Sequence, residues 1–402
     1  MGLMLNLVVL FSISLFVSLG KGQSNDSVFD VTKYGAMPNT DISQALTNVW
    51  TMACGSTSQS KVLIPEGTYQ LSIIKLTGPC KNHIQIQLEG ILEAPINLIG
   101  EHWISFQYID QFTLTGTGVF DGQGKVAWGK NDCAKNSKCS KLPINLRFNF
   151  ITNSIVSDIT SKDSKSFHVN VLGCKNLTFQ HVNINAPGYS PNTDGIHITR
   201  SIGINVTNTN ISTGDDCISL GDGSRQVTIT NITCGPGHGI SVGSLGKYVA
   251  EAPVQGVIAK NCTLINTTNG VRIKTWPSSP SFGTASDMHF EDIIMVNVSN
   301  PIIIDQKYCP WNQCDKTNPS KVKISDVSFK NIRGTAANAL AVNFVCSSQF
   351  PCEDIEVADI NLTYNGSGGP ISSQCKNVKP IFSGIQSPPA CSSPSSTAKA
   401  LA

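Results

Sequence analysis

Charged residues are scarce in this chain of 402 residues. Aspartate, glutamate, lysine and arginine make up 14% of it, against roughly 25% in an average soluble protein. The formal net charge is only +2, so the global field attracts neither nucleic acid nor an anionic membrane surface. Glycine and proline, 34 and 20 residues, are too few for a collagen-like or disordered chain. Hydrophobic residues, at 40%, suffice for a large core, so we expect a compact globular protein.

A membrane-spanning length of apolar sequence is also missing. Residues 3–19 are apolar apart from Asn6 and three serines, which is short of the ~20 residues that cross a bilayer. Small residues follow at Gly20 and Gly22, as they do at a signal cleavage site. We therefore expect residues 1–22 to be a secretory signal peptide, with a retained anchor as the alternative. The mature protein is then extracellular and free of the membrane.

The cysteines favour disulfides over a metal site. All 14 lie between Cys54 and Cys391, and an even count in an exported chain indicates disulfides. Cys309 with Cys314, and Cys346 with Cys352, are close enough to staple small loops, but spacing leaves the connectivity open. No Cys-x-x-Cys occurs, and the seven histidines are not clustered with the cysteines. We expect no zinc or other metal.

Sequons for N-glycosylation are numerous. A secreted protein is expected to carry glycans on some of them, whereas Asn- and Thr-rich strands generate others by chance. The ten candidate positions are Asn25, Asn176, Asn205, Asn210, Asn231, Asn261, Asn266, Asn297, Asn361 and Asn365.

Short strands recur along the chain. Pairs of apolar residues separated by one position begin at Val169, Ile196, Ile218, Ile240, Val271, Ile302 and Leu340. The three central pairs are 22 residues apart, and the later intervals lengthen to 31, 31 and 38. A second family of alternating strands lies between them, at residues 206–211, 227–232, 257–265 and 288–296. The pattern is that of one coil repeated, with insertions on one side.

This repeat predicts the fold class. Alternation with period two, without amphipathic helices between strands, excludes a Rossmann fold or an α/β barrel. Coils of about 22 residues with two or three short strands each are typical of a parallel β-helix. One helix is expected over residues 41–55, with Thr40 or Asp41 as N-cap, to cover the N-terminal end. We expect a single all-β domain over residues 23–391, irregular from about Lys376, and a Ser- and Pro-rich tail over residues 392–402.

Polar residues share one register in consecutive coils. Asp194, Asp216 and His238 each stand two residues before the apolar pair of their coil. Adjacent strands of a parallel sheet lie ~4.8 Å apart, so these side chains should form a column, with Asp215 beside Asp216. One coil later, cations at positions 272 and 274 alternate with core residues and should face outward.

The chemistry of this cluster is that of acid–base catalysis. Three carboxylates so close cannot all ionise freely, so at least one pKa should rise. A raised acid beside an ionised base is what glycoside hydrolysis needs, and two fixed cations suit a substrate that carries carboxylates. A single Asp beside a Gly is more often a turn former, but the shared register favours a site. The pattern predicts a hydrolase of an acidic polysaccharide.

A competing pattern is Gly239-Ile-Ser241-Val-Gly243, which matches the Gly-x-Ser-x-Gly nucleophile elbow. That motif functions on a sharp strand-to-helix turn. Ser241 lies inside a repeat strand with no helix pattern after it, so a serine hydrolase is not expected.

The chain resembles the polygalacturonases, glycoside hydrolases whose fold is a right-handed parallel β-helix. Four family motifs occur in order: Asn192-Thr193-Asp194, Gly214-Asp215-Asp216, Gly237-His238-Gly239 and Arg272-Ile273-Lys274. The resemblance extends from about Phe29 to about Cys391. Stretches such as Ser190-Pro-Asn-Thr-Asp-Gly-Ile-His and Cys309-Pro-Trp-Asn-Gln-Cys are most similar to plant pollen-type exopolygalacturonases.

The resemblance implies inverting hydrolysis of the α-1,4 bonds between galacturonic acid units of cell-wall pectin, with exo-action. Asp215 matches the general acid, Asp194 and Asp216 match the carboxylates that activate water, and His238 matches the histidine that holds the acid in its protonation state. The residues matched to substrate binding are Asn192, Arg272, Lys274 and Tyr308. No metal or organic cofactor is implied, and we expect a monomer.

Three alternatives remain at this point. Endo-action depends on whether loops leave both ends of the groove open, and the insertions at residues 247–255 and 276–286 are candidates for closing one end. A pectate lyase has a similar solenoid, but it needs Ca²⁺ and a strong base such as arginine. A non-catalytic wall-binding solenoid would be expected to lose an acid or base position, whereas all three aspartates are present.

Overall fold

The computed structural model describes residues 27–97, 100–129 and 142–391. The expected signal peptide, the Ser- and Pro-rich tail and the sequon at Asn25 lie outside these ranges. Among the described residues, no helix is both long and apolar enough to cross a membrane.

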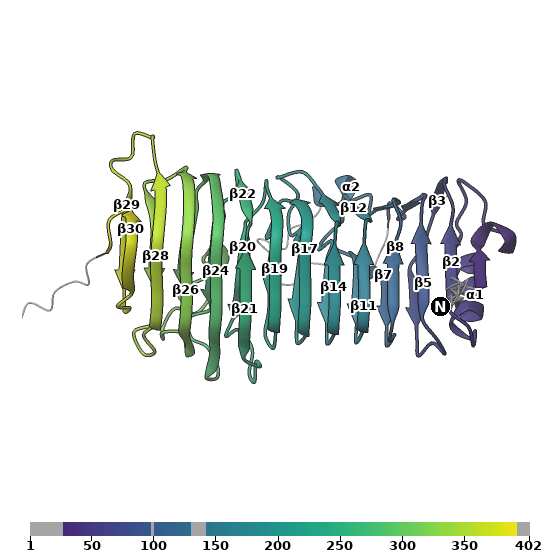
Figure 1. Cartoon of the computed structure of the whole chain (residues 1–402), viewed down its shortest axis with the longest axis horizontal. Helices are drawn as coiled ribbons and strands as arrows, with labels where there is room; N and C mark the ends of the chain where they lie inside the picture. Colours follow the sequence, from purple (N-terminus) through teal and green to yellow (C-terminus); the bar gives the residue numbers. More distant parts are fainter. Residues whose placement is uncertain (1–26, 98–99, 130–141, 392–402) are drawn as a thin grey trace, which may run out of the picture.

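The chain winds as an elongated parallel β-helix, with the coils stacked along one axis (Figure 1). One face is a sheet with eleven strands in the part of the chain that the structure describes, and we call it the site sheet because the candidate site lies on it. In spatial order its strands are β4 (Ile74–Thr77), β7 (His102–Gln107), β10 (Ile144–Asn149), β13 (Val169–Leu172), β16 (Ile196–Thr199), β18 (Ile218–Leu220), β20 (Ile240–Leu245), β23 (Asn269–Thr275), β25 (Asn300–Asp305), β27 (Leu340–Val345) and β29 (Ser372–Lys376).

The remaining faces form a second sheet, which we call the outer sheet and which has 19 strands in the described residues. Several coils contribute two short strands separated by a bend, whereas others contribute one long strand that spans both positions. In chain order the strands are β1 (Ser27–Asp30), β2 (Ser60–Ile64), β3 (Thr68–Gln70), β5 (Ile84–Leu88), β6 (Ile91–Glu93), β8 (Phe112–Thr115), β9 (Val119–Asp121), β11 (Thr152–Ser157), β12 (Thr160–Lys162), β14 (Lys175–Gln180), β15 (Asn183–Asn185), β17 (Ile202–Ser212), β19 (Arg225–Cys234), β21 (Val254–Lys260), β22 (Thr263–Ile265), β24 (Gly283–Val298), β26 (Val322–Ala336), β28 (Glu353–Thr363) and β30 (Ile381–Ser387).

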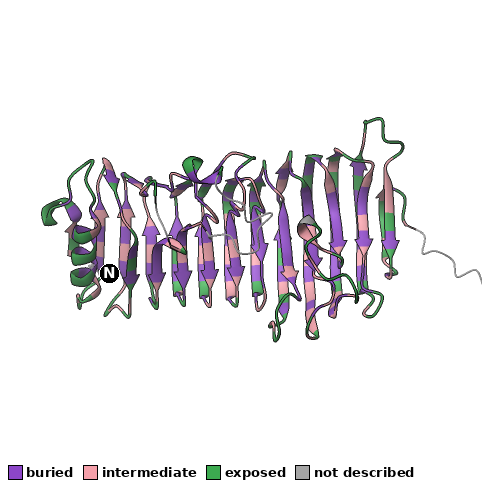
Figure 2. Cartoon of the chain, turned by 180° about the vertical axis from the view of Figure 1, so that it is seen from behind, coloured by how far each residue is buried: buried purple, intermediate pink, exposed green. Residues whose placement is uncertain are grey.

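Alternation along each strand fills the interior of the coil. The apolar pairs predicted from the sequence are register partners across β16, β18, β20, β23 and β25, and their side chains are buried. Aromatic rings stack along the axis, as Phe106 does on Phe148 with ring centroids 5.0 Å apart. The last predicted interval was wrong by two residues, because Ile302 pairs with Val342 and not with Leu340. Figure 2 shows the resulting rows of buried residues.

The N-terminal end is covered by α1 (Ser43–Cys54), preceded by the short helix η1 (Val31–Tyr34). The buried face of α1 packs on the first coils, and its outer face is exposed (Figure 2). The N-cap is Ile42, not Thr40 or Asp41 as predicted. Asp41 still satisfies the helix start, because its Oδ1 accepts the backbone N–H of Ser43 at 2.9 Å. Two further short helices are α2 (Lys125–Trp128) and η2 (Pro310–Asn312).

The fold class predicted from the sequence, a single right-handed parallel β-helix with an N-terminal capping helix, is confirmed. The irregular segment expected from about Lys376 is wrong, because β30 pairs with β28 and extends the solenoid. The expected disulfides are confirmed among the described cysteines. Five disulfides join Cys54–Cys80, Cys217–Cys234, Cys309–Cys314, Cys346–Cys352 and Cys375–Cys391. Cys174 and Cys262 are free and fill core positions as small apolar side chains.

Candidate active site

Three neighbouring coils bring the acidic residues together where the chain enters the site sheet. Asp194 precedes β16, Asp216 precedes β18 and His238 precedes β20. The backbone ladder already begins here, because Gly195 N–H donates to Asp216 O at 2.9 Å. The shared register predicted for these residues is therefore present in the structure.

Glycines beside Asp215 and His238 permit this close stacking. A Cβ at Gly214 would lie 1.9 Å from the carbonyl oxygen of Ser190, and one at Gly239 would lie 2.1 Å from that of Asn269. Gly239 also has φ of +84°, a conformation that favours glycine. The glycines of these motifs are therefore explained by close packing of the backbone. The aspartate side chains beside them are not needed for that packing and are available for chemistry.

Asp216 is the centre of a buried ionic network. Its Oδ1 accepts bonds from Arg272 Nη2 at 2.7 Å and Ser241 Oγ at 2.9 Å, and its Oδ2 accepts one from Lys274 Nζ at 2.6 Å. Burial alone would raise the pKa of this carboxyl, but Lys274 and Arg272 outweigh burial and hold the pKa well below its usual range. Asp216 is therefore held ionised.

For Asp194, burial and the neighbouring charges shift the pKa in the opposite direction. It is also buried, but its Oδ2 accepts a single hydroxyl bond, from Ser219 Oγ at 2.8 Å. Burial raises its pKa well above the usual value, and the negative charges of Asp215 and Asp216 raise it further. The pKa rise expected among the three carboxylates thus falls on Asp194.

Asp215 and His238 form a more accessible pair. Asp215 Oδ1 lies 3.0 Å from His238 Nδ1, and the two side chains are 23% and 38% exposed. Burial would lower the pKa of His238, but its hydrogen bond to Asp215 and the charge of that carboxylate outweigh burial and raise it. The histidine side chain therefore pairs with Asp215 and not with the buried carboxylates of the column.

The two cations face away from the core, as predicted, but they are not free. Lys274 is 6% exposed, and its ammonium lies against Asp216. The Tyr308 ring covers both cations, with its centroid 5.2 Å from Lys274 Nζ and 5.9 Å from Arg272 Cζ. Asn192 stands in the turn before β16 with φ of 56°, and it is not part of this network.

Sequence reasoning missed two groups that hold the carboxylates in place. Ser241 was interpreted above only as part of a false nucleophile motif. Its hydroxyl donates a hydrogen bond to Asp216 and accepts one from Arg272 Nε at 3.1 Å. Ser219 bridges Asp194 and His197, whose Nδ1 lies 2.7 Å from Ser219 Oγ. Both serines alternate with buried residues of β18 and β20, so their outward direction could have been predicted from the strand period.

The donor groups of this cluster suit proton transfer better than they suit metal binding. Donor atoms of Asp215, Asp216 and His238 lie within 4.8 Å of one another, which is close enough for a shared ligand. Both oxygens of Asp216, however, already accept bonds from fixed cations. A metal would have to compete with two positive charges, so the donor set favours acid–base chemistry.

Comparisons with known proteins agree with this chemistry. A family model described as "Glycosyl hydrolases family 28" matches residues 54–391. A polygalacturonase of Nicotiana tabacum is 54% identical over 95% of this chain and 96% of its own length. An exopolygalacturonase of Oenothera organensis is 57% identical over 88% of this chain and 98% of its own. Among solved structures, the endo-xylogalacturonan hydrolase of Aspergillus tubingensis matches with a TM-score of 0.77 at 26% identity, over 89% of this chain and 98% of that one.

Proposed function

The chain belongs to the glycosyl hydrolases of family 28, and from this premise we propose that it is a polygalacturonase. The proposal depends mainly on one observation. An accessible carboxylate–imidazole pair lies beside two buried carboxylates whose pKa values are shifted in opposite directions. Glycoside hydrolysis needs an acid and a base of this kind side by side. The relatives named polygalacturonase and exopolygalacturonase support the α-1,4-linked galacturonate chain as substrate.

The proposed roles follow from exposure and charge. Asp215, the accessible carboxylate, protonates the leaving oxygen, and His238 at 3.0 Å shares the proton with it. Asp216 stays ionised and orients the attacking water. Asp194, whose raised pKa makes it the stronger base once ionised, takes the proton from that water. Attack by water without a covalent intermediate inverts the anomeric centre.

Substrate binding is assigned to the cations and to the residues around them. Arg272 and Lys274 offer positive charge to a galacturonate carboxylate, although Lys274 shares its charge with Asp216. Tyr308 covers this pair, and Asn192, two residues before Asp194 in the chain, is assigned a supporting contact with the substrate. We propose exo-action by a secreted monomer that degrades pectin in the plant cell wall, without a cofactor. This extension depends on the similarity to exopolygalacturonases.

A time course of products from polygalacturonate tests the proposal. The expected product is saturated monogalacturonic acid from the first minutes, with little fall in viscosity. The Asp215→Asn variant should fold normally and release no product, since it lacks the acid. Ultraviolet absorption is recorded in the same run to detect unsaturated sugars.

Each other product pattern gives a different answer. Mixed saturated oligomers with rapid thinning would move the enzyme to the endo class. Unsaturated products would overturn hydrolysis in favour of a lyase. No product from folded protein would favour a wall-binding solenoid, and an active Asp215→Asn variant would overturn the role given to Asp215.

A further inference from the structure

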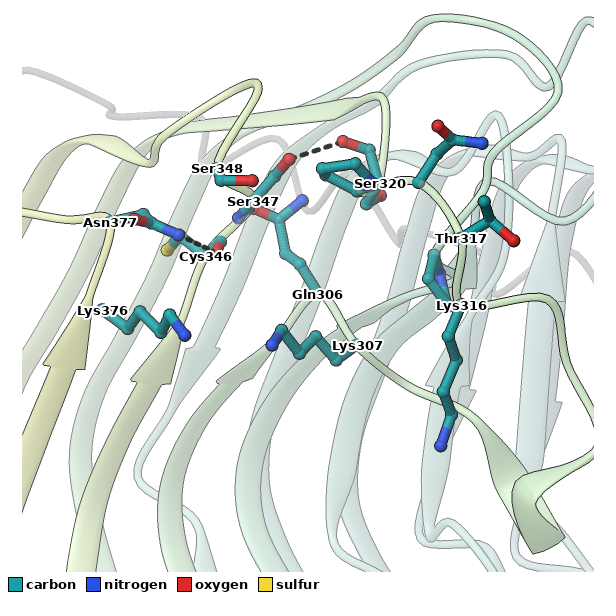
Figure 3. A pocket seen from close by; sticks show the side chains of 13 residues that line it. Gln306, Lys307, Lys316, Thr317, Ser320, Cys346, Ser347, Ser348, Lys376 and Asn377 are labelled. Atoms are coloured by element: carbon teal, nitrogen blue, oxygen red, sulfur yellow. Dashed lines mark hydrogen bonds between the residues drawn. The ribbon is translucent and has the colours of Figure 1, made fainter.

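A second hollow lies on the same side of the solenoid, closer to its C-terminal end. Its volume is about 510 Å³, and it lies where the chain leaves β25, β27 and β29. We call it the lysine pocket, and its principal residues are Gln306, Lys307, Lys316, Ser347, Lys376 and Asn377. Figure 3 shows Lys307 and Lys376 extending toward each other, with Lys316 on the other side of the hollow.

The lysine pocket lies in the same register row of the site sheet as Lys274 of the candidate active site. In the site sheet Lys274 pairs with Asp305, Asp305 with Val345, and Val345 with Lys376. Three strand spacings of ~4.8 Å separate the two lysines along this row, or roughly 14 Å. Lys307 also directly precedes Tyr308, whose ring covers Lys274. A chain bound at the catalytic carboxylates could therefore continue over the pocket.

The lysines of this pocket differ from those of the outer sheet. On that sheet Lys260, Lys323 and Lys330 each contact a carboxylate, at 3.3, 2.7 and 2.8 Å. Lys307, Lys316 and Lys376 are exposed, and none has a carboxylate within 4.0 Å among the described residues.

Two carboxylates near the lysine pocket, those of Asp305 and Asp315, already accept backbone hydrogen bonds. Asp315 accepts the backbone N–H of Thr317 at 2.8 Å. Asp305 is partly buried and accepts the backbone N–H of Lys307 at 2.9 Å. Lys316 donates to the Asn312 side chain, which carries no charge. Three positive charges thus surround the hollow, and none of the three lysines forms an ion pair within 4.0 Å with a described carboxylate.

The floor of the lysine pocket is rigid. Gln306 is 1% exposed, and its amide is fixed by Val322 O at 2.7 Å and by Ser347 N–H at 2.8 Å. Ser347 Oγ donates to Ser320 O at 2.7 Å, and Asn377 Nδ2 donates to Cys346 O at 3.0 Å (Figure 3). Flexible cations over a fixed polar floor can follow the carboxylates of a chain without rearrangement of the fold.

We propose that the lysine pocket is a distal subsite for the carboxylates of an oligogalacturonate, beyond the bond that is cleaved. This inference rests on the proposed function, which supplies a substrate with one carboxylate on each sugar. An exo-acting enzyme holds a single sugar on one side of the scissile bond, so only the long remainder of the chain can reach this distance. The pocket then determines affinity for long substrates and takes no part in bond cleavage.

The test compares short and long substrates. In a Lys307→Gln/Lys316→Gln/Lys376→Gln variant, KM for hexagalacturonate should rise roughly tenfold at low ionic strength, from three exposed ionic contacts. KM for digalacturonate and kcat for both should stay as in the wild type. Added salt should shrink the difference, because exposed charges are screened. The matched control is Lys260→Gln/Lys323→Gln/Lys330→Gln, which removes the same charge from the outer sheet.

Several outcomes would overturn the inference. They are an unchanged hexamer KM, an equal rise for dimer and hexamer, or an equal rise in the control variant. Failure of the proposed function is distinguishable, since the wild type would then hydrolyse neither substrate. In that case calorimetry with hexagalacturonate decides: weaker binding only in the pocket variant supports the subsite, and equal binding by all three proteins rejects it.

Discussion

At the scale of single residues, two buried carboxylates in one site differ because of their neighbours. Asp216 has Lys274 and Arg272 at hydrogen-bond distance, whereas Asp194 has a serine hydroxyl and two nearby negative charges. Burial acts on both in the same direction, so the cations decide which one stays ionised. The site therefore contains one aspartate that stays ionised and one whose ionisation is disfavoured, although both are the same type of residue.

The Asp194→Asn variant tests this balance. A pKa raised in the native state means that folded Asp194 holds its proton more tightly than unfolded Asp194 does, so its ionisation destabilises the fold as pH rises. Asparagine keeps the shape and an acceptor for Ser219. We expect the variant to gain about 1–2 kcal/mol of unfolding free energy at pH 7, and to lose activity. Urea unfolding at several pH values measures the gain.

The pH dependence supplies the control for Asp194→Asn. At about pH 2.5, well below the ordinary aspartate pKa of about 3.9, the carboxyl is protonated in both states, so the stability gain should vanish. An equal gain at acidic and neutral pH would show that it comes from packing and not from charge. No gain at pH 7 would contradict the raised pKa.

The sequence predicted which residues meet but not how they pair. The register of Asp194, Asp216 and His238 follows from strand spacing, and the structure has it. The bond between Asp216 and Lys274 joins residues 58 positions apart, and the side chain of His238 selects Asp215 over the other carboxylates. Such choices depend on rotamers and burial, which alternation alone does not determine.

At the scale of elements, a disulfide fixes the segment that carries Asp215 and Asp216, the aspartates to which we assign catalytic roles. Cys217 directly follows Asp216 and is bonded to Cys234 at the end of β19. Sequence spacing suggested the short staples at Cys309–Cys314 and Cys346–Cys352, which are confirmed. Sequence spacing did not predict Cys217–Cys234, because the path of the coil determines which cysteine lies next to Cys217.

The Cys217→Ala/Cys234→Ala variant should lose stability and turnover together. Opening a loop of this size, with a sequence separation of 17, costs about 3 kcal/mol. Asp215 and Asp216 then lose the covalent tether beside them, so kcat should fall severalfold even where the protein is folded. The urea midpoint and the rate of galacturonate release are measured on the same preparation.

Cys54→Ala/Cys80→Ala is the matched control for this disulfide. It opens a loop with a sequence separation of 26 near the N-terminal end, far along the axis from the site. We expect a comparable loss of stability with kcat retained. If both double variants lose kcat equally, the role of Cys217–Cys234 in positioning the aspartates is wrong.

At the scale of the whole molecule, the solenoid couples its parts only through neighbouring coils. The sequence predicted this architecture because the coil length repeats, and the family resemblance read from four motifs is confirmed by a match over residues 54–391. The capping helix α1 packs on β1, β2 and β4, whereas the site begins at β16. Between β4 and β16 the site sheet contains β7, β10 and β13. Stability at the cap and chemistry at the site should therefore be separable.

Trp50→Ala measures that separation. Trp50 is 4% exposed, its Nε1 donates to Thr77 O at 3.2 Å, and its ring meets Phe112 edge-on at 6.1 Å. Its removal should lower the free energy of unfolding by roughly 3–5 kcal/mol and reduce Tm. At a temperature where circular dichroism shows native signal, kcat and KM should equal those of the wild type, because the described elements that α1 packs against carry none of the proposed catalytic residues. A lower kcat in fully folded Trp50→Ala protein would mean that disturbance of the cap propagates along the coils, and nearest-neighbour coupling would be the wrong description of this molecule.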